Sequence, residues 1–127
     1  MNLRIALILA VGLGLSGVSR ADQLKKPDWL IGTWTICEDP DHSPKDSLQF
    51  NSDGTGLVIR SKGNVEFTHK HTIDRVSIIA YAHGYAIPIE YTVSPEHDRL
   101  FLYSKRTGHT SYYVRTDSRL MEHCSSK

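Results

Sequence analysis

The stretch VEFTHKH, residues 65–71, alternates strictly between two kinds of side chain. In an extended strand, side chains two residues apart point to the same face of the sheet. Val65, Phe67, His69 and His71 would therefore share one face, and the polar residues between them would share the other. This period of two predicts a β-strand whose Val65 and Phe67 point into an apolar core.

The same kind of pattern recurs along the chain, in short alternating or β-branched segments separated by turn-forming residues. Such segments at a spacing of roughly 8–12 residues are typical of a β-sandwich or a β-barrel. We expect eight strands, at residues 33–37, 47–50, 55–61, 65–71, 75–83, 87–93, 99–104 and 109–115. An antiparallel meander of this length removes its free edges by closing into an up-and-down barrel. The alternative is a flattened two-sheet sandwich.

Three segments carry more specific expectations. Residues 75–83 are apolar on both faces, as in a strand that is covered on both sides. Pro88 cannot donate a sheet hydrogen bond, so its strand lies at an edge, or Pro88 sits at the beginning of the strand or at a bulge. The tail, residues 117–127, forms either a short helical turn or a last strand tied back by Cys124.

The first 21 residues have the parts of a secretory signal peptide. Arg4 supplies a positive charge before the apolar run IALILAVGLGL (5–15), which is too short to span a bilayer comfortably. Small residues at Ser19 and Ala21 mark a cleavage site after Ala21. Cleavage leaves residues 22–127 as one domain, in the periplasm or secreted beyond it, without membrane insertion.

The charge of the chain is nearly balanced, with 15 Lys and Arg residues against 14 Asp and Glu residues. Two of the basic residues, Arg4 and Arg20, leave with the signal peptide. Nucleic acids and anionic membranes are bound through clustered basic residues that displace counterions. Neither is expected as a partner.

Cys37 and Cys124 are the two cysteines of the chain. In an oxidising compartment, such a pair forms a disulfide rather than a redox or metal site. We therefore predict one bond between them, which closes a long loop and stabilises the fold by roughly 4–5 kcal/mol in the chain-entropy estimate.

The triplet GTW, Gly32 to Trp34, at the start of the first predicted strand resembles the Gly-x-Trp signature of lipocalins and of smaller lipocalin-like bacterial domains. The segments FNSDGTG (50–56) and DRLFLYSK (98–105), with the YYVR ending at Arg115, look similar to the latter group.

This resemblance implies that Trp34 plugs the closed end of the barrel and that Arg115 packs over it in a cation–π contact. Trp29 would then cover the base of the barrel from outside. The resemblance also implies a carrier of a small hydrophobic ligand. Because the strands are short, an eight-stranded interior is barely wider than its own side chains, so we expect a packed core with a shallow cup at one end.

His69 and His71 are the sharpest candidates for chemistry, because they share the inward face of one strand. Two inward imidazoles could ligate zinc or haem iron if a third ligand converged on them. No cysteine or carboxylate is tied to them by spacing. We expect both at the open rim of the barrel, as a candidate ligand rim, with no metal and no other cofactor.

The loop EDPDHSPKD (38–46) is a candidate for contact with a partner, because it groups Glu38, Asp39, Asp41 and His42. Its spacing fits no EF-type calcium site. A protruding acidic loop of this kind can enter a cationic or catalytic cleft on another protein. The alternative is a solvated loop of turn-forming residues.

The bend YAHGYA (81–86) is the second candidate contact, through Tyr81, His83 and Tyr85. Tyrosine is enriched at interfaces, so this cluster can form the rim of a pocket or a contact patch. Packing between strands is the alternative role for these tyrosines.

The sequence does not predict an enzyme, because it lacks Gly-x-Ser-x-Gly, His-Glu-x-x-His and a phosphate-binding loop. It favours a non-catalytic exported protein that binds and neutralises a protein partner, as an inhibitor of an envelope-targeting hydrolase or an immunity protein against a secreted toxin. The alternative is a lipocalin-like carrier of a small hydrophobic ligand. A structural or envelope-stress role is not separated from these two.

Overall fold

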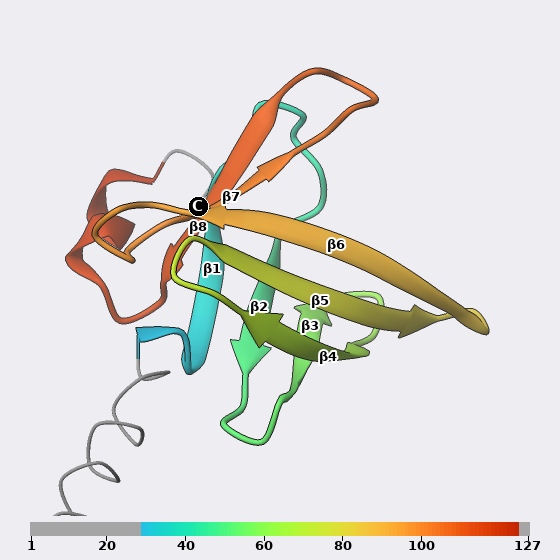
Figure 1. The fold of residues 1–127 in the computed structure, drawn as a ribbon. Coiled ribbons are helices and arrows are strands. Elements are labelled where there is room, and N and C mark those ends of the chain that lie inside the picture. Colours follow the sequence, from blue (N-terminus) through green and yellow to red (C-terminus); the bar gives the residue numbers. More distant parts are fainter. Residues whose placement is uncertain (1–28, 125–127) are drawn as a thin grey trace, which may run out of the picture.

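The structure is a computed structural model that describes residues 29–124. Eight antiparallel strands close into a single barrel in chain order, and the last strand pairs with the first (Figure 1). The strands are β1 (Gly32–Glu38), β2 (Asp46–Phe50), β3 (Thr55–Arg60), β4 (Val65–His71), β5 (Arg75–Ala82), β6 (Tyr85–Val93), β7 (Leu100–Tyr103) and β8 (Thr110–Arg115). The predicted all-β up-and-down barrel is confirmed, and the sandwich is wrong. The predicted signal peptide, residues 1–21, lies outside the described residues.

The strand 65–71 has the predicted bounds, whereas β6 begins two residues earlier than predicted. The cause is the connection between β5 and β6, in which His83 and Gly84 both have positive φ angles of 53° and 80°. A two-residue turn of this kind matches the twist of the flanking strands. Pairing therefore continues to Ala82 and Tyr85, so that much of the YAHGYA bend is strand.

Inward-facing side chains fill the barrel. In β4, Val65 and Phe67 pack in or against the core while Glu66 and Thr68 are exposed, as the alternation predicts. The largest fully buried side chains are Trp34, Phe50, Phe67, Leu30, Leu48, Ile78 and Leu100. Aromatic rings reach across the interior, with the Phe50 and Phe67 ring centres 5.3 Å apart.

Cys37 and Cys124 form the predicted disulfide, across a sequence separation of 87 residues. The tail forms a short 3₁₀ helix, η2 (Arg119–His123), so the helical alternative is confirmed. The Ser118 side chain accepts a hydrogen bond from the backbone N–H of Leu120 and caps this helix. The two cysteines pack with Val114 into a small second core on the outside of the barrel.

Pro88 lies in a strand whose outer edge is unpaired, which confirms the first of the three positions predicted for it. β6 pairs with β5 from Tyr85 to Thr92, but with β7 only at Thr92 and Val93. Most of β6 therefore has no strand on its second side, and in Figure 1 β7 and β8 turn away from the β5–β6 hairpin. No helix within residues 29–124 is long and apolar enough to cross a membrane.

Candidate functional site

The order of the hairpins decides which loops meet at each end of the barrel. The connections after β1, β3, β5 and β7 lie at one end, which we call the mouth. The other connections lie at the opposite end, together with the segment that enters β1, and we call this end the base. The candidate partner-binding segments, 38–42 and 81–85, both belong to the mouth.

At the base, Trp34 is fully buried and its indole N–H donates to the carbonyl oxygen of Leu30 at 2.9 Å. The guanidinium carbon of Arg115 lies 5.8 Å from the centre of the Trp34 ring. Gly32 has a φ of +127°, and a Cβ at this position would lie 2.7 Å from Nη2 of Arg115. The glycine two residues before the tryptophan therefore leaves the space that the arginine occupies.

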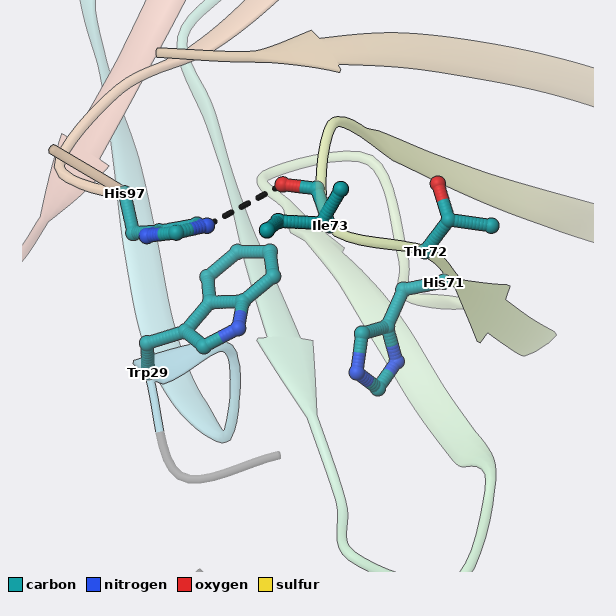
Figure 2. A pocket seen from close by; sticks show the side chains of 5 residues that line it. All are labelled: Trp29, His71, Thr72, Ile73 and His97. Carbon is teal, nitrogen blue, oxygen red and sulfur yellow. Dashed lines mark hydrogen bonds between the residues drawn. The ribbon is translucent and has the colours of Figure 1, made fainter. Parts of the chain in front are cut away.

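His71 also lies at the base, where it contacts Trp29 edge to face with ring centres 5.5 Å apart. On the other side of Trp29, the His97 ring lies 4.6 Å away, and its Nε2 donates to the carbonyl oxygen of Ile73 (Figure 2). These residues line a shallow pocket of about 410 Å³. Trp29 covers this end of the barrel from outside.

His69 points into the edge of the core, with its ring 5.1 Å from Phe50. Its Nε2 donates to the carbonyl oxygen of Asn51 at 3.0 Å, which leaves Nδ1 as a buried acceptor with no partner among the described residues. The expected position of His69 and His71 at the open rim is wrong, because β4 ends at the base. Among residues 29–124, no group of three or more His, Cys, Asp or Glu side chains could hold a metal ion.

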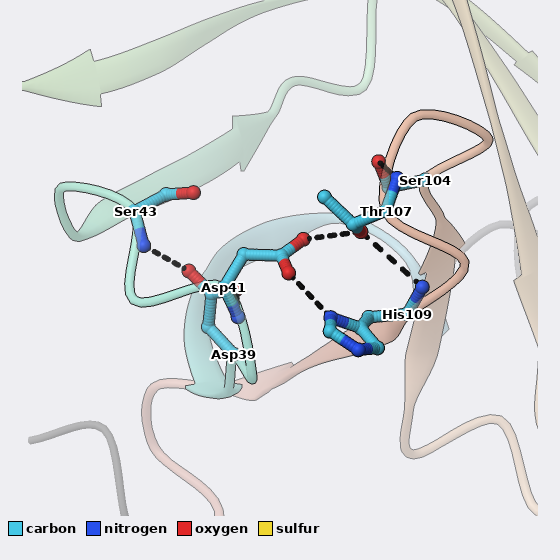
Figure 3. A network of polar contacts seen from close by, with 6 residues as sticks. All are labelled: Asp39, Asp41, Ser43, Ser104, Thr107 and His109. Atoms are coloured by element: carbon cyan, nitrogen blue, oxygen red, sulfur yellow. Dashed lines mark hydrogen bonds and ion pairs between the residues drawn. The ribbon is translucent and has the colours of Figure 1, made fainter.

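At the mouth, the acidic loop folds onto the connection between β7 and β8 (Figure 3). The Asp41 carboxylate accepts hydrogen bonds from Thr107 at 2.8 Å and from Nδ1 of His109 at 2.6 Å. These two bonds, that of His109 first, lower the pKa of Asp41. The Asp39 carboxylate accepts from the backbone N–H groups of Asp41 and Ser43.

The carboxylates of Asp39 and Asp41 are thus bound within the chain and do not project freely. Glu38 is half-buried at the end of β1. His42 is exposed at a turn position with φ 53°. The loop holds one side of the mouth in place, which is a structural task that sequence spacing did not indicate.

Below this loop, Asp46 and Tyr113 line a small polar pocket of about 220 Å³. The Tyr113 hydroxyl donates to Asp46 at 2.8 Å. Burial raises the pKa of Asp46, although the bond from Tyr113 opposes this shift. Burial also raises the pKa of Tyr113 and of its ring neighbour Tyr91. The bond between Asp46 and Tyr113 therefore ties β2 to β8 beside this pocket.

The outer part of the β5–β6 hairpin, residues 79–89, is apolar and exposed, and we call it the β5–β6 arm. On its outer face, Ile79 and Tyr81 are 39% and 51% exposed. On its inner face, Tyr85 and Ile87 are 72% and 42% exposed. His83 is exposed at the turn. The expectation that residues 75–83 are covered on both faces is wrong for the outer face, because no described element packs over it.

Hollows flank the arm on both sides. A cleft of about 660 Å³ follows the gap between β6 and β7, with Ile78, Ile89 and Leu102 among its lining residues. A second hollow of about 380 Å³ lies beside Tyr81, over β3 and β4. Tyr81 thus stands between a neighbouring recess and the uncovered edge of β6.

No family model matches the chain, and neither a curated protein nor a solved structure matches it.

Proposed function

We propose that this chain is a non-catalytic, exported binding protein that contacts another protein through the β5–β6 arm. The single observation that carries the proposal is the exposure of apolar side chains on both faces of that arm. The run from Val76 to Ile89 contains no Asp, Glu, Lys or Arg. Exposed apolar patches of this kind mark interaction sites, and the centres of interfaces are poor in charge and rich in tyrosine.

The non-catalytic role is supported by the contacts of three histidines. His69 and His97 donate to backbone carbonyl oxygens, and His109 bonds to Asp41. A general acid or base needs a free position beside a site where substrate can sit. In this barrel the same groups fasten turns and loops.

We propose the periplasm or the extracellular space as the location of the protein, since residues 1–21 read as a signal peptide. The disulfide between Cys37 and Cys124 suits an oxidising compartment. Within the class of exported binding proteins, we propose an inhibitor of an envelope-targeting hydrolase or an immunity protein against a secreted toxin. Both act by covering a surface on their partner.

The second candidate function is that of a lipocalin-like carrier of a small hydrophobic ligand. Two observations favour it: Arg115 lies over Trp34 at the base, as in the Gly-x-Trp resemblance, and an apolar cleft opens between β6 and β7. Because core side chains fill the centre of the barrel, the ligand would occupy this lateral cleft.

The experiment is affinity capture from envelope extract with three matched baits: wild type, Tyr85→Ser with Ile87→Ser, and Ile73→Ser. Ile73 is 76% exposed at the base, far from the arm along the barrel, and serves as the control. We expect a protein that wild type and the control retain and the arm variant loses. The captured protein is then purified and its activity is measured. Inhibition by wild type and by the Ile73→Ser control, but not by the arm variant, would identify the activity that is neutralised.

Retention of the same proteins by all three baits contradicts the arm as the contact. Retention of a lipid by wild type in equimolar amount, without any protein, favours the carrier instead. Both proteins and extracted small molecules are therefore identified by mass spectrometry.

A further inference from the structure

We infer that, in the absence of another partner, the β5–β6 arm is covered by the arm and cleft of a second copy of this chain, in a two-fold dimer. The inference rests on the proposed function only in that both use the arm. It adds a way to regulate binding: a copy that is paired with a second copy cannot bind another protein through the same residues.

The charge pattern of the outer face fits an apolar occupant. In the rows nearest the turn, Tyr81 pairs with Ala86 and Ile79 with Pro88. Further from the turn, Arg75 lies 3.3 Å from Glu90 in an ion pair. An apolar centre beside a charged rim is the usual arrangement of an interface, and a charged occupant would lose its hydration over this centre without gaining a partner.

Once the predicted signal peptide is removed, the remaining residues before Trp29 and the final residues SSK (125–127) offer no apolar occupant. Residues 22–28 read DQLKKPD, with four charged side chains and Leu24 as the single large apolar one. They also precede Trp29, which lies at the base, whereas the tip of the arm lies at the mouth. A second copy, in contrast, offers the same uncharged arm.

Pro88 excludes one kind of contact and thereby favours another. An uncovered strand such as β6 ordinarily accepts a further strand through its free N–H and C=O groups. Pro88 has no N–H and lies within the uncovered part of β6, so a continuous ladder cannot form along it. The arm must be recognised by its side chains, as a projection that enters a recess.

The arm and its flanking hollow are complementary to each other. Tyr85 and Ile87 project from the inner face, and the neighbouring cleft is lined by Ile78, Ile89 and Leu102. A two-fold axis places a projection of each copy opposite a recess of the other, because such an interface uses the same patch twice. One contact therefore fills both clefts.

The size of the patch predicts a weak dimer. A fully buried aromatic side chain contributes roughly 150–250 Å². Tyr81 and Tyr85 of the arm and Tyr103 of the cleft are partly exposed, and together with the isoleucines of the arm they offer on the order of 500 Å² per copy. Two copies would bury about 1,000 Å², which is the lower limit of specific interfaces. A weak dimer releases the arm readily when another protein competes for it.

Sedimentation velocity of the oxidised chain 22–127 tests the inference, from micromolar to millimolar concentration. We expect a dimer whose share rises with concentration for wild type and for Ile73→Asp. Tyr85→Asp with Ile87→Asp should remain monomeric, with at least a tenfold loss of association. The milder Tyr85→Ser should lie between them, and thermal unfolding with near-ultraviolet dichroism verifies that each variant is folded.

A cross-linking experiment locates the contact. A copy with Ile87→Cys is mixed with a copy with Tyr103→Cys, whose side chain lines the cleft. We expect a disulfide between the two different copies on mild oxidation, and none when Ile73→Cys replaces Ile87→Cys.

Three results overturn the inference. The first is that wild type is monomeric at millimolar concentration, and the second is that the folded variant Tyr85→Asp with Ile87→Asp still dimerises. The third such result is that Ile73→Asp weakens the dimer as much as the arm variant does. A monomeric wild type that still captures a protein through the arm overturns the dimer alone. A dimer whose arm captures no protein overturns the proposed function alone.

Discussion

Arg115 of the last strand, β8, packs over Trp34 of the first strand, β1. Its guanidinium carbon lies 5.8 Å from the centre of the Trp34 ring, while its Nη1 donates to the carbonyl oxygens of Trp29 and Ile31 at 3.0 and 2.8 Å. One side chain from the last strand thus holds the segment that enters the first strand. Barrel closure and the covering of the base depend on the same contact.

Replacing Arg115 by Ala should lower the free energy of unfolding by about 2–4 kcal/mol. Hydrogen bonds from a charged donor contribute roughly 1.5–3 kcal/mol each, and a cation–π contact adds about 0.5–1 kcal/mol. The expected loss lies below the sum for two bonds because the Arg115 side chain is 29% exposed and water partly replaces these contacts. Urea unfolding measures the change. Arg106→Ala, in the β7–β8 connection, is the control, and an equal loss in both variants would contradict a special role for Arg115.

Replacing Gly32 by Ala should destabilise the barrel by about 1–3 kcal/mol, because its φ of +127° strains any side chain and a Cβ meets Arg115. Part of this loss should disappear in an Arg115→Ala background, since the obstructing group is then absent. A double-mutant cycle in urea measures the coupling. Strict additivity of the two substitutions would show that only the backbone angle matters.

Replacing Asp46 by Asn should raise stability at neutral pH. Because burial raises the pKa of Asp46, the folded chain binds a proton there more tightly than the unfolded chain does. Ionisation therefore removes stability as pH rises through the raised pKa. The amide keeps an oxygen for the Tyr113 hydroxyl, so the gain should shrink at about pH 3, where Asp46 is largely protonated. Exposed Glu96→Gln should show no such pattern.

Replacing Asp41 by Ala should release the acidic loop while the barrel stays folded. The lowered pKa of Asp41 means that its bonds to His109 and Thr107 contribute stability above the unfolded pKa, and that this contribution is lost as pH falls through the lowered value. Hydrogen exchange of the loop amides should accelerate, with little change in Tm. Acidification of wild type should have the same local effect, and Asp74→Ala should not.

Replacing both Cys37 and Cys124 by Ala should destabilise the chain by up to about 5 kcal/mol, as expected for a long closed loop. Exchange protection should fall first in η2, because the disulfide joins this segment to β1. The barrel strands should keep their protection in the absence of urea. Global unfolding of the reduced chain would mean that the bond holds β1 in place as well.

The alternation of apolar residues was enough to predict the barrel and most of its strands, because sheet faces follow a period of two. The predicted position of His69 and His71 at the open rim was wrong, although the number of preceding turns in the sequence indicates the correct end of the barrel. Successive hairpins reverse direction, so the fourth strand ends where the first begins, beside Trp29. Alternation indicates a face of the sheet, and the count of turns indicates the end of the barrel.

Other parts of the site could not be read from local patterns. Asp41 and His109 are 68 residues apart, and only closure of the barrel brings their loops together. The uncovered face of Ile79 and Tyr81 was mistaken for a covered one, because an apolar strand looks the same whether its cover belongs to the same chain or to another molecule.

Pro88 also bears on how this protein behaves when concentrated. An apolar strand with an open flank is the usual starting point for fibrils, in which identical chains stack without limit along one direction. Pro88 has no N–H to donate along the open flank of β6, so one bond of every added layer is missing. We therefore expect the hairpin to expose apolar side chains on both faces without stacking strand by strand into fibrils.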